Sequence, residues 1–502
     1  MKSLVYKINY KLTLFILGFL ALVNGVFMLL SAGVSWAYKD GTLIHILTAG
    51  GLAALLGSLL MLFTRNYKRE ISTRESFLMV ALSWIFMAFV GTLPYLISGT
   101  IPHFTDAFFE SMSGFTTTGA TILEDVERIP KGILFWRSFT NWIGGMGMVV
   151  LAIALFPLMG VGGMQLFAAE SPGPESDKLS PRIKETAKRI WLIYVGYTAL
   201  ETLFLKLAGM SFFDAVNHAM ASLATGGFST KNDSMAFWDA QPMIQYIVIL
   251  FMFLGGTNFV LSYYAFKGKF KSVWKNEEFR AYALLVVGLV LITTLVIYFK
   301  ADPSQDGIAH PMVWGPFESS FRHAALQVVS VLTTTGFVSA DFSMWTPFLT
   351  LLFLGIMLIG ASAGSTSGGP KVVRYLILVK NSMVSFKRIL HPMGIFSVRL
   401  NGKAVERPVV SNIVSFFVLY LFSFGVGTLV FSWLDLDLIT AMGSAATTLG
   451  NVGPGLGDFG PIGNFGEMPT FGKWWSSCLM LVGRLELFTI FILFSPFYWR
   501  NS

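Results

Sequence analysis

The chain has 502 residues, of which 54% are apolar and only 13% are charged, and its formal net charge is +8. An ordinary soluble domain carries roughly 25% charged residues, so this composition excludes a soluble globular protein. An aromatic content of 15% excludes a disordered chain, because disordered segments are poor in aromatic residues. The single cysteine, Cys478, excludes an internal disulfide and a cysteine metal cluster.

Long apolar segments recur along the chain, as expected for helices that cross a bilayer with about 20 residues each. They predict ten spans, one of them short, near residues 12–34, 42–63, 76–97, 132–158, 190–209, 243–266, 282–299, 348–360, 409–434 and 474–497. The basic segment 1–11 leads into the first run, which we interpret as a retained helix because no small-residue cleavage pattern closes a short apolar core. The expected fold class is therefore an all-α polytopic membrane protein.

Charged residues divide by sign between alternate connections. One set of connections holds 23 basic and 9 acidic residues: 1–11, 64–75, 159–189, 267–280 and 380–407. The intervening connections hold 6 basic and 15 acidic residues. Basic loops face the cytoplasm in most membrane proteins, so the pattern predicts that both termini are cytoplasmic. It also explains the positive net charge without a nucleic-acid partner.

Shorter, half-polar segments lie between some of the spans, and each ends in a cluster of Thr and Gly. The four clusters are Ser113–Gly119, Ser222–Gly226, Ser330–Gly336 and Ser444–Gly450, and their closing glycines are 107, 110 and 114 residues apart. This spacing predicts four tandem repeats of helix, short pore helix, loop and helix around one axis. The predicted units are residues 76–189, 190–280, 281–407 and 408–502, preceded by two additional transmembrane helices within residues 1–75.

Four loops around one axis predict a pore, because non-helical backbone at membrane depth must be buried in protein or line a water-filled cavity. Backbone carbonyls can replace the hydration shell of a cation, and the short helices would point their partly negative ends at it. The four clusters contain no carboxylate, which favours a monovalent cation. The alternative is that Thr and Gly only allow close helix packing. Three aspartates near the starts of the short helices are expected to act as N-caps: Asp106, Asp214 and Asp437.

These loops resemble those of the superfamily of Trk, Ktr and HKT potassium transporters, in which each of four pore loops carries one filter glycine. The stretch Asp177–Arg189, the motif Gly450-Asn-Val-Gly-Pro-Gly455 and the two additional N-terminal helices are similar to the bacterial TrkH branch. The resemblance places the filter glycines at Gly119, Gly226, Gly336 and Gly450. The implied K⁺ filter comprises Thr117, Thr118, Gly119, Thr225, Gly226, Thr334, Thr335, Gly336, Leu449, Gly450 and Asn451. Glycine rather than serine at position 119 points to potassium.

The resemblance also implies partners that the residues alone do not. It implies a homodimer with one pore per subunit, in the inner membrane, gated by a cytosolic TrkA-type ring that binds a nucleotide. The only ligand expected on this chain is then the potassium ion, without an organic cofactor. The basic connections would suit either such a partner or lipid headgroups.

The span that begins near residue 348 is interrupted by a run rich in Gly and Ser. The run Gly360-Ala-Ser-Ala-Gly-Ser-Thr-Ser-Gly-Gly-Pro-Lys371 cannot hold a continuous helix well. The family has its intramembrane gate at this place, which implies gate residues Gly360, Ala361, Ser362, Ala363, Gly364, Ser365, Thr366, Ser367, Gly368 and Gly369. The alternatives are a packing kink and a phosphate-binding loop. Pro370 stands where a phosphate-binding loop needs Lys, and we expect the other second spans to be uninterrupted.

Besides Arg500 near the C-terminal end, ten charged residues remain outside the assigned connections: Glu110, Arg137, Glu201, Lys206, Asp214, Arg322, Lys371, Arg374, Arg484 and Glu486. Ionisable groups at membrane depth are functional candidates by default. Arg484 lies near the middle of the last span, where the family has an arginine that faces the pore, so we assign it to the gate. Its alternative is an ion pair with Glu201 or Glu110. Satisfied buried contacts are expected for Asn217, His218, Arg322 and His323.

The sequence thus predicts a potassium uptake protein that conducts the ion through a filter of carbonyl groups and performs no covalent chemistry. The alternative is a secondary transporter that couples K⁺, or a mixture of K⁺ and Na⁺, to H⁺ or Na⁺. Four repeats in the same direction argue against the inverted halves that are typical of secondary transporters.

Overall fold

The computed structural model describes residues 9–66, 73–146, 183–301, 308 and 310–499. Among these residues the secondary structure is helical apart from one two-stranded antiparallel hairpin, β1 (Arg399–Leu400) with β2 (Lys403–Ala404). Six described helices are long and apolar enough to cross a membrane, or eight if two bent helix pairs are each one span. The fold is therefore that of a mostly helical protein with several apolar spans.

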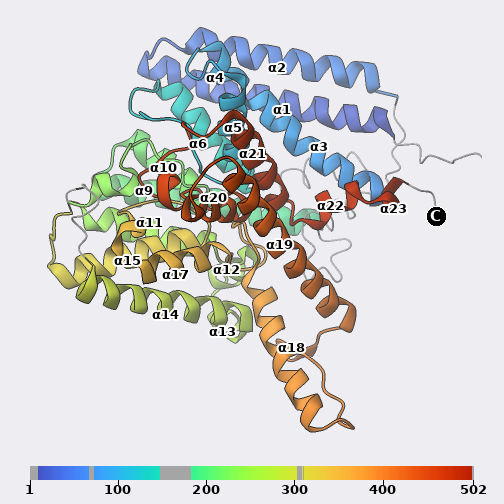
Figure 1. Ribbon diagram of the computed structural model, residues 1–502. Helices are drawn as coiled ribbons and strands as arrows, with labels where there is room; N and C mark the ends of the chain where they lie inside the picture. The colour runs from blue at the N-terminus through green and yellow to red at the C-terminus, as the bar shows by residue number, and fades with distance from the viewer. Residues whose placement is uncertain (1–8, 67–72, 147–182, 302–307, 309, 500–502) are drawn as a thin grey trace, which may run out of the picture.

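The N-terminal part of the chain forms two long antiparallel helices, α1 (Tyr10–Tyr38) and α2 (Leu43–Thr64), which lie side by side at one edge of the molecule (Figure 1). Small residues allow their close approach: a Cβ added to Gly57 would lie 2.5 Å from the carbonyl oxygen of Gly18. Asp40, in the turn between them, accepts a 2.6 Å hydrogen bond from the backbone N–H of Gly132. The pair is thereby attached to the start of the helix that begins at Lys131.

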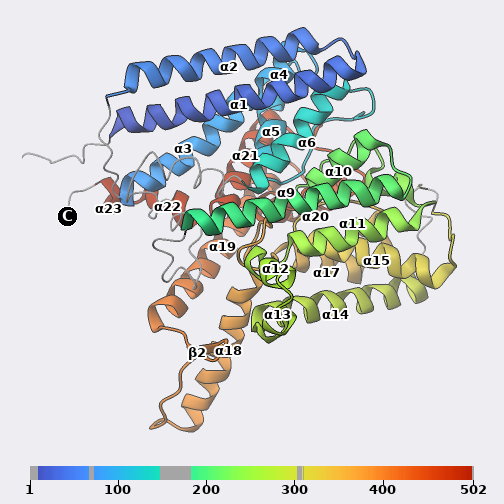
Figure 2. The same cartoon turned by 180° about the vertical axis from the view of Figure 1, so that it is seen from behind.

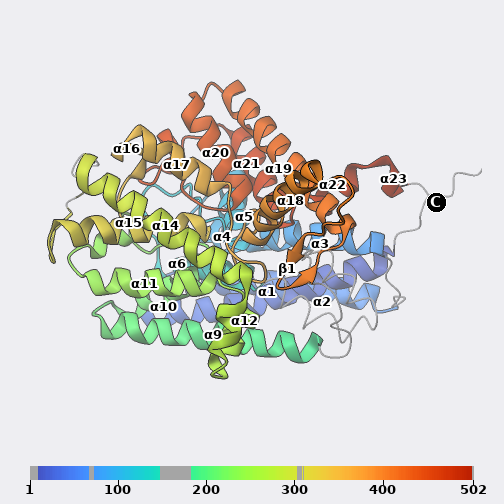
Figure 3. The ribbon, with the colours of Figure 1, turned by 90° about the horizontal axis from the view of Figure 1, so that it is seen from below.

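The described helices after α2 fall into four successive sets. The first set is α3 (Thr73–Gly91), α4 (Leu93–Ile97), α5 (Phe104–Phe115) and α6 (Lys131–Gly145); the second is α9 (Ile183–Leu207), α10 (Phe212–Leu223), η2 (Ser234–Trp238), α11 (Pro242–Gly255), α12 (Phe259–Phe266) and α13 (Phe270–Lys275). The third is α14 (Glu277–Lys300), α15 (Pro316–Leu332), α16 (Phe342–Trp345), α17 (Pro347–Met357) and α18 (Val372–Leu390); the fourth is α19 (Arg407–Trp433), α20 (Leu438–Gly450), η4 (Gly457–Phe459), α21 (Thr470–Arg484), α22 (Phe488–Phe494) and α23 (Pro496–Trp499). Figure 3 shows these sets following one another around the middle of the molecule.

The second helices break more often than the sequence predicts. Helices α11 and α12 meet at an angle of 110°, and α21 and α22 meet at 114°. The expectation that only the run after residue 360 is interrupted is therefore wrong. The breaks follow Gly255 and Arg484, the last residues of α11 and α21. Within the predicted span 132–158, helix α6 ends at Gly145, and residues 147–182 lie outside the described part of the chain.

The short helices α5, α10, α15 and α20 are buried along most of their length. Of the three aspartates expected as N-caps, only Asp437 acts as one, with Oδ2 accepting from the N–H groups of Ile439 and Thr440. Ser211 is the N-cap of α10, and Asp214 lies in its first turn. Asp106 likewise lies in the first turn of α5, where it pairs with Lys473 at 2.7 Å. Figure 2 shows α10 and α20 among the longer helices from behind.

Candidate functional site

The backbone turns in the same way after each of the four short helices. One residue in each turn has a left-handed conformation: Thr117 (φ 53°), Thr225 (φ 52°), Thr334 (φ 57°) and Asn451 (φ 55°). Two residues later stands a glycine with positive φ: Gly119 (82°), Gly227 (66°), Gly336 (85°) and Gly453 (112°). Residues that carry a side chain rarely adopt the φ values of these four positions, which explains why glycine occupies them. The residue between donates its N–H to the carbonyl five positions earlier, as Thr118 does to Ser113 at 2.9 Å.

The four positive-φ glycines lie against one another in a closed ring. A Cβ added to each would lie within 2.7 Å of a carbonyl oxygen of the next loop: Gly119 to Gly226 at 2.3 Å, Gly227 to Thr335 at 2.0 Å, Gly336 to Val452 at 2.2 Å and Gly453 to Thr118 at 2.7 Å. Each contact links one loop to the next in chain order, and the fourth returns to the first. The loops are therefore at one level, and any side chain at these glycines would collide with backbone.

This geometry aligns the loops differently from the sequence spacing. The equivalents of Gly119 and Gly336 are Gly227 and Gly453, whereas the expected glycines were Gly226 and Gly450. Gly226 is equivalent to Thr118, since each precedes the positive-φ glycine of its loop by one residue. Leu449 and Gly450 belong to α20, which extends to Gly450 and is closed by Asn451, whose N–H donates to Thr447 O. The fourth cluster therefore contributes its turn three residues later than predicted.

Asn451 takes the place that threonine holds in the other loops. Its Nδ2 donates to Thr118 Oγ1 at 3.0 Å and to the carbonyl oxygen of Met480 at 2.8 Å. The amide thus joins the fourth loop to the first loop and to α21. Within the first loop, Thr116 Oγ1 and Thr118 Oγ1 lie 2.8 Å apart and share a hydrogen bond.

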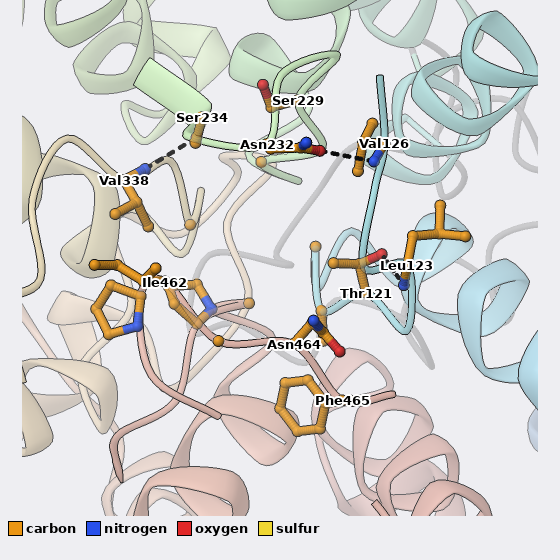
Figure 4. Close-up of a pocket in the computed structure, with 18 of the residues that line it drawn as sticks. Thr121, Leu123, Val126, Ser229, Asn232, Ser234, Val338, Ile462, Asn464 and Phe465 are labelled. Atoms are coloured by element: carbon orange, nitrogen blue, oxygen red, sulfur yellow. Dashed lines mark hydrogen bonds between the residues drawn. The ribbon is translucent and has the colours of Figure 1, made fainter. Parts of the chain in front are cut away.

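A cavity of about 110 Å³ opens directly on the glycine ring, and all four positive-φ glycines line it. Figure 4 shows that its walls come from segments of all four sets of helices. Hydrogen bonds cross-link these walls: Asn232 Oδ1 accepts from Val126 N at 2.7 Å, and Ser234 Oγ accepts from Val338 N at 3.2 Å. We call this cavity the vestibule.

Arg137 also lines the vestibule, although it is almost completely buried. Its Nε donates to Glu110 Oε1 at 2.6 Å, and its Nη1 donates to the carbonyl oxygen of Ser229 at 2.9 Å. Its guanidinium lies 3.6 Å from the ring centroid of Phe228. The sequence marked both charges as lying at membrane depth, but the long separation of Glu110 and Arg137 along the chain hid their pairing.

Beneath the ring, the ends of the second helices contact the ends of the short helices. A Cβ added to Gly144 would lie 1.9 Å from the carbonyl oxygen of Phe115, and one on Gly483 would lie 2.0 Å from that of Leu449. The residue that follows faces the next loop in order: Gly145 approaches Ala224, and Gly256 approaches Thr333. In the fourth set this following residue is Arg484.

The run between α17 and α18 lies across this lower level and contacts the second, third and fourth sets of helices. Thr366 Oγ1 donates to the carbonyl oxygen of Leu223 at 2.9 Å. The N–H of Gly368 donates to Thr334 Oγ1 at 2.6 Å, and a Cβ at Gly368 would lie 2.6 Å from the carbonyl oxygen of Gly450. The N–H of Ser362 donates to the carbonyl oxygen of Gly256 at 3.0 Å. We call residues 360–369 the crossing loop.

Arg484 connects the crossing loop to the first set. Its Nη1 donates to Thr117 Oγ1 at 3.0 Å and to the carbonyl oxygen of Thr366 at 2.9 Å, and its Nη2 donates to the carbonyl oxygen of Gly144 at 2.8 Å. Thr117 is the left-handed residue of the first loop, so Arg484 bonds to the loop itself.

Other charges hold the two ends of the crossing loop. Lys371 Nζ donates to the carbonyl oxygen of Ser367 and, at 3.1 Å, to its Oγ. Arg374 pairs with Glu486, two residues after Arg484. Glu278 of α14 accepts a 2.6 Å hydrogen bond from the N–H of Ala363.

Comparison with known proteins gives a consistent result over the whole chain. The model of the TrkH family, described as a cation transport protein, matches residues 44–501. The chain belongs to the TrkH family. It is 39% identical to the Trk system potassium uptake protein TrkH of Vibrio parahaemolyticus over 492 residues, which are 97% of this chain and 98% of the relative. It is 40% identical to the TrkH protein of Escherichia coli strain K12 over 490 residues, which are 97% of this chain and 98% of the relative.

A solved structure of a TrkH family member matches the fold as well. The crystal structure of the potassium transporter TrkH from Vibrio parahaemolyticus has a TM-score of 0.85 and 36% sequence identity, and the match covers 98% of this chain and 100% of that chain. The resemblance read from the Thr/Gly clusters is therefore confirmed. The TrkH relatives are named for transport, in agreement with the expectation that the chain is not an enzyme.

Proposed function

We propose that this chain takes up potassium across the cytoplasmic membrane by conducting it through the glycine ring. This proposal is supported mainly by the closed ring of Gly119, Gly227, Gly336 and Gly453 at the floor of the vestibule. Four tandem repeats then surround one pore, with α1 and α2 as an addition at its edge. The TrkH relatives are named potassium uptake proteins, which supports the choice of ion.

The ion ligands in this proposal are backbone carbonyls and threonine hydroxyls of the four loops. We assign carbonyls from Thr117, Thr118, Gly119, Thr225, Gly226, Gly227, Thr334, Thr335, Gly336, Asn451, Val452 and Gly453 to the filter. Carbonyl rings replace the water of a monovalent cation without a formal charge. The short helices α5, α10, α15 and α20 end at these loops, so their partly negative C-terminal ends favour a cation there.

The crossing loop is the gate in this proposal. Residues 360–369 lie under the filter loops and are held there by hydrogen bonds to the second, third and fourth sets. An ion that leaves the filter meets this loop, so conduction requires the loop to move. Arg484 holds the loop in the arrangement described here and places a positive charge beside the ion path.

The orientation and partners are proposed on the same basis. The basic connections, which include Lys267, Lys269 and Lys271, would face the cytoplasm together with both termini. The relatives are named as members of a Trk system, which suggests further components. We propose a homodimer and a cytosolic TrkA-type ring that binds the nucleotide, with lipid around the apolar spans.

The test is ion flux through the purified protein in liposomes, with K⁺, Rb⁺, Na⁺ and Li⁺ compared. We expect K⁺ and Rb⁺ to pass faster than Na⁺ and Li⁺, down their own gradients and without a second ion gradient. Flux that requires an imposed H⁺ or Na⁺ gradient would instead support the coupled transporter. Gly119→Ser is expected to raise Na⁺ permeation, and unchanged discrimination in this variant would contradict the filter assignment.

A further inference from the structure

Three metal-ligating side chains meet beside the third filter loop, away from the ion path described above. Asp239 follows η2, His310 precedes α15, and His323 lies within α15. Each offers one ligand atom, and these atoms all lie within 4.8 Å of one another. Their side chains are nearly inaccessible, with exposed fractions of 2%, 4% and 1%.

The carboxylate of Asp239 divides its two oxygens between different partners. Oδ2 faces the histidines, at 2.6 Å from His310 Nδ1 and 3.8 Å from His323 Nε2. Oδ1 faces Arg322 Nη1 at 3.4 Å and also accepts from Gln245 Nε2. The carboxylate is therefore fixed from behind by donors, while its other oxygen remains directed at the two imidazoles. Such outer donors orient the ligands of protein metal sites.

His323 is held in a similar way. Its Nδ1 lies 2.9 Å from Ser339 Oγ, and its buried Nε2 has no hydrogen-bond partner among the described residues. When Nδ1 donates its hydrogen to Ser339, Nε2 presents a lone pair to the carboxylate of Asp239. A lone pair and a carboxylate oxygen repel each other, so a cation between them would stabilise the pair.

The surrounding charges leave room for a cation. Asp239 and Glu318 are acidic, and Arg322 is the basic group between them, with its Nε 3.1 Å from Glu318 Oε1. With both histidines neutral, these three groups sum to a charge of −1. One proton would therefore make the buried cluster neutral, and one divalent ion would give it a charge of +1.

We propose that Asp239, His310 and His323 form a binding site for a divalent transition metal of the zinc class. Two imidazoles and one carboxylate are the ligand set that suits Zn²⁺, with a fourth position left for water. Tetrahedral bonds of about 2.0–2.1 Å place ligand atoms about 3.3 Å apart, so side-chain movements of an ångström or less complete the site. Binding through Nδ1 would move the hydrogen of the neutral His310 imidazole from Nδ1 to Nε2, and the bonds formed are metal–nitrogen and metal–oxygen only.

The site is mechanically connected to the filter. Ser339 is three residues after Gly336, and the carbonyl oxygen of nearby Val338 accepts a 2.8 Å hydrogen bond from the N–H of Met235. Gln245, which supports Asp239, also donates to the carbonyl oxygen of Met235 at 2.8 Å. A bound metal would therefore brace the second and third loops against each other on the vestibule side.

The test uses the full chain, purified without a histidine tag, with Co²⁺ as a spectroscopic probe. The background carries His45→Ala, His103→Ala and His391→Ala, which remove exposed histidines that bind metals weakly. We expect one Co²⁺ per chain with the absorption bands of a tetrahedral site, competition by Zn²⁺, and loss of the bands in His323→Ala and in His310→Ala. Ser339→Ala, which removes only the hydroxyl that supports His323, is expected to raise the Kd for Co²⁺ about tenfold.

X-ray absorption of the zinc-loaded background protein gives a second readout that needs no ligand variant to fold. It should show about two imidazoles in the coordination shell. A shell of oxygen atoms alone, absence of stoichiometric Co²⁺ binding, or binding that persists in a folded His323→Ala protein would each overturn the proposal. Absence of binding would leave a proton as the cation of this cluster.

Discussion

Arg484 donates a hydrogen bond of 2.9 Å to the backbone carbonyl oxygen of Thr366. This bond joins the bend between α21 and α22 to the middle of the crossing loop. Because the same Nη1 also donates to Thr117 Oγ1 at 3.0 Å, one guanidinium connects the filter to the gate that we propose beneath it. Movement of the loop must break this contact.

Removing this guanidinium is expected to favour the open loop. A hydrogen bond that involves a charged group contributes about 1.5–3 kcal/mol, and about 1.4 kcal/mol corresponds to a factor of ten in an equilibrium. We therefore expect Arg484→Ala to raise K⁺ flux in liposomes by about tenfold. Arg484→Lys keeps the charge but cannot reach three oxygens at once, so its K⁺ flux should lie between that of the unsubstituted protein and that of Arg484→Ala. Equal flux in all three proteins would show that Arg484 does not restrain the gate.

Much of this site follows from residue types that the sequence displays. Thr117, Thr225 and Thr334 stand where the predicted clusters end, and the left-handed turns occur at these residues. The Gly and Ser residues of the run 360–369 predict a weakened helix, and the run does interrupt the helical structure between α17 and α18. Local composition was sufficient in both cases, because a broken helix needs residues that tolerate unusual backbone conformations.

Other parts depend on contacts that spacing does not encode. The fourth cluster is followed by two candidate filter glycines, Gly450 and Gly453. Gly453 is the one in the loop because α20 continues to Gly450. The bend after Gly255 has the same origin, since Gly255 and Gly256 approach the ends of neighbouring helices. The cluster of Asp239, His310 and His323 joins residues from three segments, so only the fold brings it together.

The glycine assignment can be tested with matched alanine substitutions. Gly453→Ala would place a Cβ 2.7 Å from the carbonyl oxygen of Thr118 at a φ of 112°, which an L side chain rarely adopts. We expect this variant to lose most K⁺ flux and its discrimination against Na⁺. Gly355→Ala is the control, because a Cβ there meets nothing within 4 Å. Normal selectivity in Gly453→Ala would mean that the fourth loop binds ions elsewhere.

The buried pair of Glu110 and Arg137 should be sensitive to loss of one partner. Arg137→Leu leaves the carboxylate of Glu110 in a site that is 0% exposed, where an unpaired charge costs about 3–5 kcal/mol. We expect a clear fall in the thermal unfolding midpoint. The double variant Glu110→Leu with Arg137→Leu should recover much of this loss, because it removes both charges. Measuring the two variants and the single Glu110→Leu protein by thermal denaturation completes the cycle, and additive losses would contradict a direct pairing.

Asp437 predicts a dependence of stability on pH. Hydrogen bonds from Thr440 and from the N–H of Ile439 hold the pKa of this carboxyl below its ordinary value of 3.8. A lowered pKa in the folded state means that the ionised carboxylate stabilises the fold above about pH 4. That contribution is lost as the pH falls through the folded-state pKa.

Substitution at this position separates the cap from the charge. Asp437→Ala removes the N-cap of α20 and should cost about 1 kcal/mol at pH 7, seen as a lower thermal unfolding midpoint. Asp437→Asn still caps the helix, so at pH 7 it should stay close to the unsubstituted protein. The difference between the unsubstituted and Ala proteins should shrink at pH 3, whereas the difference between Asn and Ala should not. An Ala variant as stable as the unsubstituted protein at pH 7 would mean that α20 is held by its packing alone.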